Sequence, residues 1–298
     1  IASCLVGSEM CIRDRCTTYR ASYYVCTMSP PSSGGIAIAQ ALGILENFDL
    51  SKYGPTNPTN EGGVPSVMGV HLVSEAERLA YADRDKYVAD TDFIPLPGKG
   101  VSTMLDKAYL KQRAALIQPD GKSLGTASAG ALGDVPLGVD KTVERGTTHF
   151  SIVDAYGNVV SMTSTVESSM GSFHMVGGFL LTNQLTDFSA QPADGAGVPI
   201  ANRVAPGKRP RSTMAPTLVF KGTEPGDFVM ATGSPGGGTI IQYVLKTVVG
   251  AVDWNLDAQQ ATSLVNFGAT NSPTTNVDGA NTALDLTCLL YTSPSPRD

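Results

Sequence analysis

The feature that most constrains this fold is a change of character near the middle of the chain. Residues 118–146, "QPDGKSLGTASAGALGDVPLGVDKTVERG", are dominated by small residues, Gly and Asp, and no helical or strand period survives in them. Such a long structureless stretch is uncommon inside a compact domain and usually has a function or is mobile. Helical patterns lie mostly before this linker and strand patterns mostly after it.

Apolar spacing and turn residues predict the individual elements. Residues 17–28 are β-rich, and Ser33 is suited to cap the helix that follows. Before the linker, helices are expected within 36–50, ending near Asn47, and at 66–90 and 104–117, with a loop at 51–65. After it, strands are expected at 147–155, 158–167, 176–182, 215–221 and 227–232, and the turn 233–239 leads into a helix.

The two ends do not fit the polypeptide between them. Residues 4–15 and 288–298 resemble translated sequencing-adapter DNA, so segments 1–15 and 288–298 are treated as non-native. The native chain is expected to continue at both ends. The two remaining cysteines, Cys16 and Cys26, do not identify a redox compartment.

Several function classes are disfavoured by composition. The net charge is −6 and no dense basic stripe occurs, which argues against nucleic-acid binding. The apolar run "YVLKTVVGAV" is short and contains Lys246, so no membrane span is expected. The three histidines are scattered and no CxxC pair exists, so we expect neither a metal site nor a cofactor.

Residues 145–167, "RGTTHFSIVDAYGNVVSMTSTVE", predict a β-hairpin with an unusual number of hydroxyls. A three-residue loop ending in Gly157 pairs Asp154 with Asn158. Counting back along the ladder, His149 faces Thr163 and Thr147 faces Thr165. The opposite face is expected to be core, with Phe150, Val160, Met162 and Val166.

This hydroxyl-lined face has two interpretations. Threonine is a good strand former, so cross-strand threonine pairs are ordinary. Alternatively, cleavage between Gly146 and Thr147 makes Thr147 a chain terminus, whose α-amine can act as general base toward its own Oγ. Thr165 would then hold that hydroxyl by a hydrogen bond.

Two other segments offer groups that an acyl-transfer site needs. In "ATGSPGGGTII" the backbone N–H groups of Gly236 and Gly237 are candidate oxyanion donors, although the segment could be only a tight turn. In "KRPRSTMAPTLVF" four side chains could bind a carboxylate, unless they form a solvated basic turn. They are Arg209, Arg211, Ser212 and Thr213.

Asp187, in "NQLTDFS", lies beside an aromatic residue and suits an ammonium group. A single loop aspartate is, however, more often a turn former.

In order and spacing, four segments resemble the γ-glutamyltranspeptidases: "TTHFSIVDAYGNVVSMTSTVESSMGS", "GGFLLTNQLTDFS", "PGKRPRSTMAPTLVF" and "TGSPGGGTIIQYVL". Together with "MSPPSSGGIAIAQALGILENFDL" and "EAERLAYADRDKYVADTDF", the resemblance covers residues 19–285. It implies an α+β fold, the four-layer αββα sandwich of N-terminal-nucleophile hydrolases, incomplete at both ends. It also implies a periplasmic or secreted protein.

The resemblance further implies self-cleavage before Thr147, giving a large-subunit part, 16–146, and a small-subunit part, 147–287. The two subunits from one precursor stay together. Thr147 would attack a small-molecule γ-glutamyl amide, and water or an amino-acid or peptide acceptor would complete the reaction. By position, Thr165 supports the nucleophile, with Thr163 as its neighbour, and Gly236 and Gly237 form the oxyanion hole.

The same resemblance assigns substrate contacts. Asp187, with Gln184 nearby, matches the carboxylate that receives the substrate α-ammonium. Ser212 and Thr213 match a Ser-Ser pair that binds the α-carboxylate.

Three departures from the family pattern stand out. Glu167 replaces an Asn beside the substrate amine. Residues 189–210 lack the lid tyrosine of many members, which favours hydrolysis over transfer. The carboxylate-binding arginine of the early large subunit is absent, so the chain as given is expected to be inactive.

Three alternatives remain. A cephalosporin (glutaryl) acylase uses the same nucleophile and fold without an ammonium pocket. A poly-γ-glutamate depolymerase is another enzyme of this kind. The contrasting class is an uncleaved, inactive homologue that only binds.

Overall fold

A computed structural model describes residues 16–133 and 135–277 of the 298-residue chain. The two adapter-like segments, 1–15 and 288–298, lie outside the described residues.

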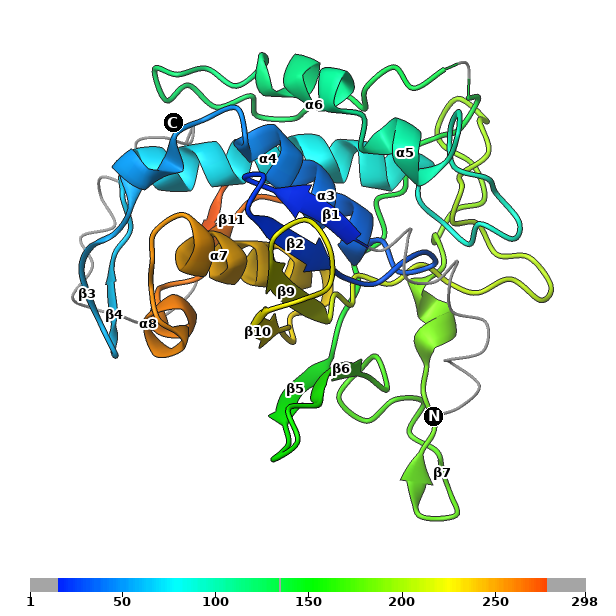
Figure 1. Ribbon diagram of the computed structural model, residues 1–298. Coiled ribbons are helices and arrows are strands. Elements are labelled where there is room, and N and C mark those ends of the chain that lie inside the picture. Colours follow the sequence, from blue (N-terminus) through cyan, green and yellow to red (C-terminus); the bar gives the residue numbers. More distant parts are fainter. Residues whose placement is uncertain (1–15, 134, 278–298) are drawn as a thin grey trace.

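Three helices form the centre of the molecule, and α3 (Gly34–Leu45) is buried along its whole length. It packs against α4 (Val67–Tyr87) and α7 (Ile240–Val252) (Figure 1). Smaller helices surround them: α5 (Val101–Met104), α6 (Lys107–Ala114), α8 (Ala258–Ser263) and the 3₁₀ turns η1 (Leu50–Tyr53), η2 (Gln184–Asp187) and η3 (Gly237–Thr239). The side chains of α3 are almost all apolar or small, which allows burial on every side.

Two helix predictions need correction. The predicted helix 104–117 is divided, because the Asp106 side chain accepts a hydrogen bond from the Tyr109 N–H at 2.9 Å and starts α6 afresh. Ser33 precedes α3, but its hydroxyl makes no capping bond; it donates to the Ser212 carbonyl at 2.7 Å.

Helix α4 matches its predicted extent, but its charged side chains are not solvated. Five of them are buried: Glu75, Glu77, Arg78, Asp83 and Arg84. The helix lies between α3 on one side and the segments following α6 on the other, so its polar face is covered as well. Buried charges require partners, and Arg78 pairs with Glu75 at 3.3 Å.

The main sheet is antiparallel, with strand order β1-β2-β9-β10. Its strands are β1 (Cys16–Tyr19), β2 (Tyr23–Cys26), β9 (Thr217–Lys221) and β10 (Phe228–Thr232). Val25 and Val219 are paired neighbours on its buried face and join the helical core. A Cys16–Cys26 disulfide links the first two strands.

Four short hairpins complete the part of the chain that the structure describes. Three are β3 (Thr56–Thr59) with β4 (Gly62–Val64), β7 (Met175–Val176) with β8 (Phe179–Leu180), and β11 (Phe267–Gly268) with β12 (Asn276–Val277). The predicted strand 176–182 is therefore wrong. Gly177 and Gly178 both have positive φ and turn the chain back after two residues.

The fourth hairpin joins β5 (Thr148–Val153) to β6 (Val159–Ser164) and projects away from the main sheet (Figure 1). Its predicted register is confirmed, since His149 faces Thr163 and the Asp154 N–H donates to the Asn158 carbonyl. The predicted core face is wrong: Phe150 and Val160 are 42% and 48% exposed. The hydroxyl face is the one that meets β10, where Ser161 donates to the Thr232 carbonyl at 3.0 Å.

These elements form an α+β structure with helices packed on one face of the four-stranded sheet. None of the described helices combines the length and apolar character that crossing a bilayer requires. The linker 118–146 contains no helix or strand among its described residues, as predicted. It is nevertheless fixed: the Gly130 N–H donates to Asp83 at 2.7 Å and the Asp140 N–H donates to the Asp85 carbonyl at 2.9 Å.

Candidate active site

The linker enters β5 through the peptide bond between Gly146 and Thr147, and two hydroxyls meet there. The Thr147 hydroxyl donates to the Gly146 carbonyl oxygen, and the Thr165 hydroxyl donates to the same oxygen at 3.1 Å. Thr165 Oγ also accepts from the Glu167 N–H at 2.7 Å. The chain therefore brings both predicted threonines to one carbonyl.

Gly146 has no room for a side chain. Its φ is +67°, in the region that favours glycine, and a Cβ built on it would lie 1.4 Å from the Glu167 carbonyl oxygen. Glu167 itself has φ +73°, which is uncommon for a residue with a side chain. The two residues pack backbone to backbone, so the position of the Gly146–Thr147 bond depends on the end of β6.

The glycine turn after β10 packs against the backbone of this segment at Glu144 and Arg145. A Cβ on Gly237 would be 2.3 Å from the Glu144 carbonyl oxygen, and the Gly238 N–H donates to that oxygen at 3.1 Å. The predicted oxyanion donors were Gly236 and Gly237, whereas the N–H that contacts the linker in this state belongs to Gly238. The donor roles of Gly236 and Gly237 toward a reacting carbonyl stay a prediction.

The imidazole of His149 is held on the hydroxyl face of the hairpin. Its Nδ1 lies 2.9 Å from Thr163 Oγ and its Nε2 lies 3.0 Å from Ser151 Oγ. Burial lowers the pKa of His149 below its ordinary value. Thr163 is thus bonded to His149 rather than to Thr147 or Thr165.

Asp187 lies buried in η2, next to two other carboxylates. The Gln184 amide donates to it, and Asn202 donates to its backbone carbonyl at 2.8 Å. Burial, then the nearby charges of Glu144 and Glu167, raise the pKa of Asp187 to about 7. Glu167 is also buried and accepts from the Asn183 amide. Asp187, Glu144 and Glu167 thus form a negatively charged group of side chains, the acidic cluster, whose charge suits a cation.

Ser212 and Thr213 are both occupied by contacts within the chain. Thr213 is buried and donates to the Gly237 carbonyl at 2.7 Å, while Ser212 Oγ accepts from the Met214 N–H at 3.1 Å. Thr213 therefore anchors the glycine turn in this state. Their predicted contact with a substrate carboxylate stays a prediction.

The two arginines of the same segment do not form a free anion site. Arg209 bonds Asp90 and Asp92, each at 2.6 Å, so its predicted role in binding an external carboxylate is not supported. Arg211 is buried and does bind carboxylates, but they belong to the chain itself. Its guanidinium lies 3.1 Å from Asp140 and 3.6 Å from Glu144.

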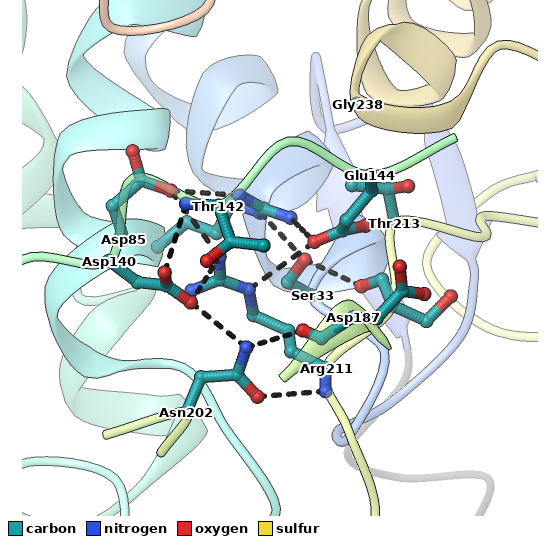
Figure 2. A network of polar contacts seen from close by, with 12 residues as sticks. Ser33, Asp85, Asp140, Thr142, Glu144, Asp187, Asn202, Arg211, Thr213 and Gly238 are labelled. Atoms are coloured by element: carbon teal, nitrogen blue, oxygen red, sulfur yellow. Dashed lines mark hydrogen bonds and ion pairs between the residues drawn. The ribbon is translucent and has the colours of Figure 1, made fainter. Parts of the chain in front are cut away.

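Arg211 belongs to a buried polar network that the sequence reasoning missed (Figure 2). Arg84 bonds the Glu144 carboxylate, Asp85 at 2.8 Å and Ser33 Oγ at 2.8 Å. The Asn202 side-chain amide bridges Asp140 and the Asp187 carbonyl, and its oxygen Oδ1 accepts from the Arg211 backbone N–H. The only sequence signal was the density of charged residues along α4, which resembles a solvated helix face.

A large open cavity of about 1180 Å³ borders this network. Its walls include Arg84 and Asp85 of α4, the linker residues 137–144 and the loop 189–196. Glu144 and Gly238 line it as well, so the cavity reaches the segment before Thr147.

Comparison with known proteins places this arrangement in a family. The chain is 40% identical over 256 residues to a glutathione hydrolase proenzyme of Escherichia coli (strain K12), a match that covers 82% of this chain and 40% of that protein. It is 39% identical over 250 residues to the glutathione hydrolase proenzyme of Bacillus subtilis (strain 168), covering 80% and 39% respectively. It is also 32% identical over 246 residues to an acylase ACY 1 proenzyme of Pseudomonas sp. (strain SE83), covering 82% and 38%.

Among solved structures, a cephalosporin acylase from Bacillus halodurans superposes with a TM-score of 0.68 at 23% identity. The superposition covers 88% of this chain and 41% of the acylase chain. This likeness supports the N-terminal-nucleophile fold. The chain spans about two fifths of the length of these relatives. The family model of γ-glutamyltranspeptidase matches residues 10–284, and the chain therefore belongs to the γ-glutamyltranspeptidase family.

Proposed function

We propose that this chain is the part of a γ-glutamyl hydrolase/transpeptidase precursor that contains the self-cleavage site, with Thr147 as nucleophile. The observation that carries the proposal is the convergence of the Thr147 and Thr165 hydroxyls on the Gly146 carbonyl oxygen. The names of the relatives, glutathione hydrolase proenzymes, agree with a protein made as a precursor.

The proposed cleavage needs no residue outside this segment as nucleophile. Thr147 Oγ forms a bond to the Gly146 carbonyl carbon, the Gly146–Thr147 C–N bond breaks, and the hydroxyl proton passes to the new α-amine. Thr165, already bonded to the carbonyl oxygen at 3.1 Å, stabilises the negative charge that develops there. Water then hydrolyses the ester, which leaves Gly146 as a carboxylate and Thr147 as a free N-terminus.

The freed Thr147 then uses its own α-amine as general base. Its Oγ attacks the γ-carbonyl carbon of a γ-glutamyl amide, and the proton is delivered to the leaving amine. Water or an amino acceptor breaks the acyl-enzyme. The acidic cluster around Asp187 supports a substrate that carries an α-ammonium group, because a cation there relieves the repulsion between buried carboxylates.

The main alternative is a glutaryl acylase of the same fold, since the chain is also similar to an acylase proenzyme. A glutaryl group lacks the ammonium that the acidic cluster around Asp187 would bind. The absence of a tyrosine in residues 189–210 further supports hydrolysis over transfer. By resemblance the precursor is proposed to be periplasmic or secreted.

The experiment compares γ-glutamyl-p-nitroanilide with glutaryl-p-nitroanilide on the full-length precursor that contains this chain. The proposal expects the γ-glutamyl substrate to be preferred, and Asp187→Asn to remove most of that preference. Equal or greater activity on the glutaryl substrate supports the acylase. No activity on either, with a single uncleaved band on a gel, supports a binding homologue.

A further inference from the structure

We propose that Glu144 is a positioning residue for self-cleavage, a buried carboxylate latch that holds the peptide bond before Thr147 in place and is released with the cleaved tail. The inference rests on the proposed function and adds a residue to it that no sequence motif indicated.

Glu144 is held at both its side chain and its backbone. Its carboxylate bonds Arg84 of α4 and lies 3.6 Å from Arg211 Nε. Its carbonyl oxygen accepts from the N–H of Gly238, which belongs to the glycine turn, at 3.1 Å. Figure 2 shows Glu144 within the polar network. The residue is 6% exposed, so these contacts are shielded from water and are stronger than the same contacts at a surface.

The neighbours of Glu144 provide no comparable side-chain anchor. Val143 is 75% exposed, and the Arg145 side chain is exposed as well. Gly146 follows, and its contacts are made by its backbone. Of residues 143–146, Glu144 is thus the one whose side chain fixes the linker to the helical core, two residues before the bond that is cut.

The charges of the network allow the latch to open. With Glu144 in place, three carboxylates surround two guanidinium groups: Glu144, Asp85 and Asp140 against Arg84 and Arg211. When the tail leaves, that is residues 141–146, Asp140 stays bonded to Asn202, and Asp85 and Asp140 still balance both arginines. Release therefore leaves no buried cation without a partner. An unpaired buried cation would be strongly unfavourable.

Departure of Glu144 also changes the charge of the acidic cluster around Asp187. The charge of Glu144 is one of the causes, after burial, that raise the pKa of Asp187. The other charged groups acting on Asp187 are Glu167 and Arg211, and the Gln184 amide bonds it. Loss of Glu144 removes one negative neighbour of Asp187. The Asp187 carboxyl therefore ionises more readily after cleavage, when it is needed to bind a substrate ammonium group.

The test is a time course of self-cleavage in the full-length precursor, followed on gels. Glu144→Gln removes the charge and keeps the shape, Glu144→Asp keeps the charge on a side chain one methylene shorter, and Arg145→Gln is the matched control for a charge lost in the same segment. We expect Glu144→Gln to slow cleavage at least about 10-fold, Glu144→Asp to recover part of the rate, and Arg145→Gln to cleave within about twofold of the wild type.

A second readout separates positioning from general stability. Once cleaved, Glu144→Gln enzyme is expected to show the wild-type KM for γ-glutamyl-p-nitroanilide, whereas a damaged fold would alter it. Wild-type cleavage rates in Glu144→Gln, or a Glu144→Asp rate no higher than that of Glu144→Gln, overturn the inference. A wild-type precursor that never cleaves contradicts the proposed function instead, so the two failures are distinguishable.

Discussion

Replacing Gly146 by alanine is expected to slow self-cleavage strongly while leaving the fold intact. The left-handed conformation, φ +67°, costs a side-chain-bearing residue about 1–2 kcal/mol. The larger effect is steric, because the new Cβ would lie 1.4 Å from the Glu167 carbonyl oxygen, which is backbone and cannot rotate away. To reach ordinary contact the two segments must separate by about 2 Å.

That separation moves the bond to be cut away from Thr165. Since a misplacement of about 1 Å can reduce a rate about 100-fold, we expect Gly146→Ala to slow cleavage by at least about 100-fold. The assay is the accumulation of the two subunits on gels, with circular dichroism to confirm folding.

Gly125→Ala is the matched control for this substitution. Gly125 lies in the same linker at φ +68°, but nothing lies within 4 Å of the position of its Cβ. It bears the conformational cost without the clash, so its precursor should cleave within about twofold of the wild-type rate. If Gly146→Ala cleaves as fast as Gly125→Ala, the packing of Gly146 on Glu167 does not position the bond, and the reasoning is refuted.

Two further predictions concern Thr165 and Asp187. Thr165→Val keeps the shape but removes the donor to the Gly146 carbonyl, so cleavage should slow about 100-fold on gels; an unchanged rate would show that this hydroxyl does not act on the carbonyl. Because the pKa of Asp187 is raised to about 7, the folded precursor binds more protons than the unfolded chain between its ordinary pKa near 4 and about 7. The contribution of Asp187 to the free energy of unfolding is thus present below that pH window and is lost as the pH rises through it. In uncleaved Thr147→Ala precursor, urea unfolding should show a lower free energy of unfolding at pH 8 than at pH 5, and adding Asp187→Asn should make this difference smaller. An equal difference in both proteins contradicts the raised pKa of Asp187.

Local rules predicted the strand pairing of the β5–β6 hairpin well. The loop from Asp154 to Asn158, with Gly157 in the left-handed region, fixes the register by itself, so the pairing of His149 with Thr163 followed from counting. The sequence also predicted the lack of helices and strands in the linker, because Gly and small residues leave it without a helical or strand period of apolar residues.

Contacts between segments that are distant in the sequence could not be predicted from local patterns. Arg84, Glu144 and Arg211 come from a helix, the linker and the segment before β9, and no sequence spacing brings them together. The charged residues of α4 have the pattern of a solvated face, yet the linker and residues 269–275 cover them. Likewise, Phe150 and Val160 alternate as core residues do, but the described part of the chain leaves their face exposed.

The central claim is that Thr147 cuts the bond before itself, and mass spectrometry of the small subunit from the full-length precursor tests it most directly. We predict a fragment that begins at Thr147, together with a Thr147→Ala precursor that stays whole under the same conditions. A fragment that begins at another residue, or cleavage that persists in Thr147→Ala, would contradict the account.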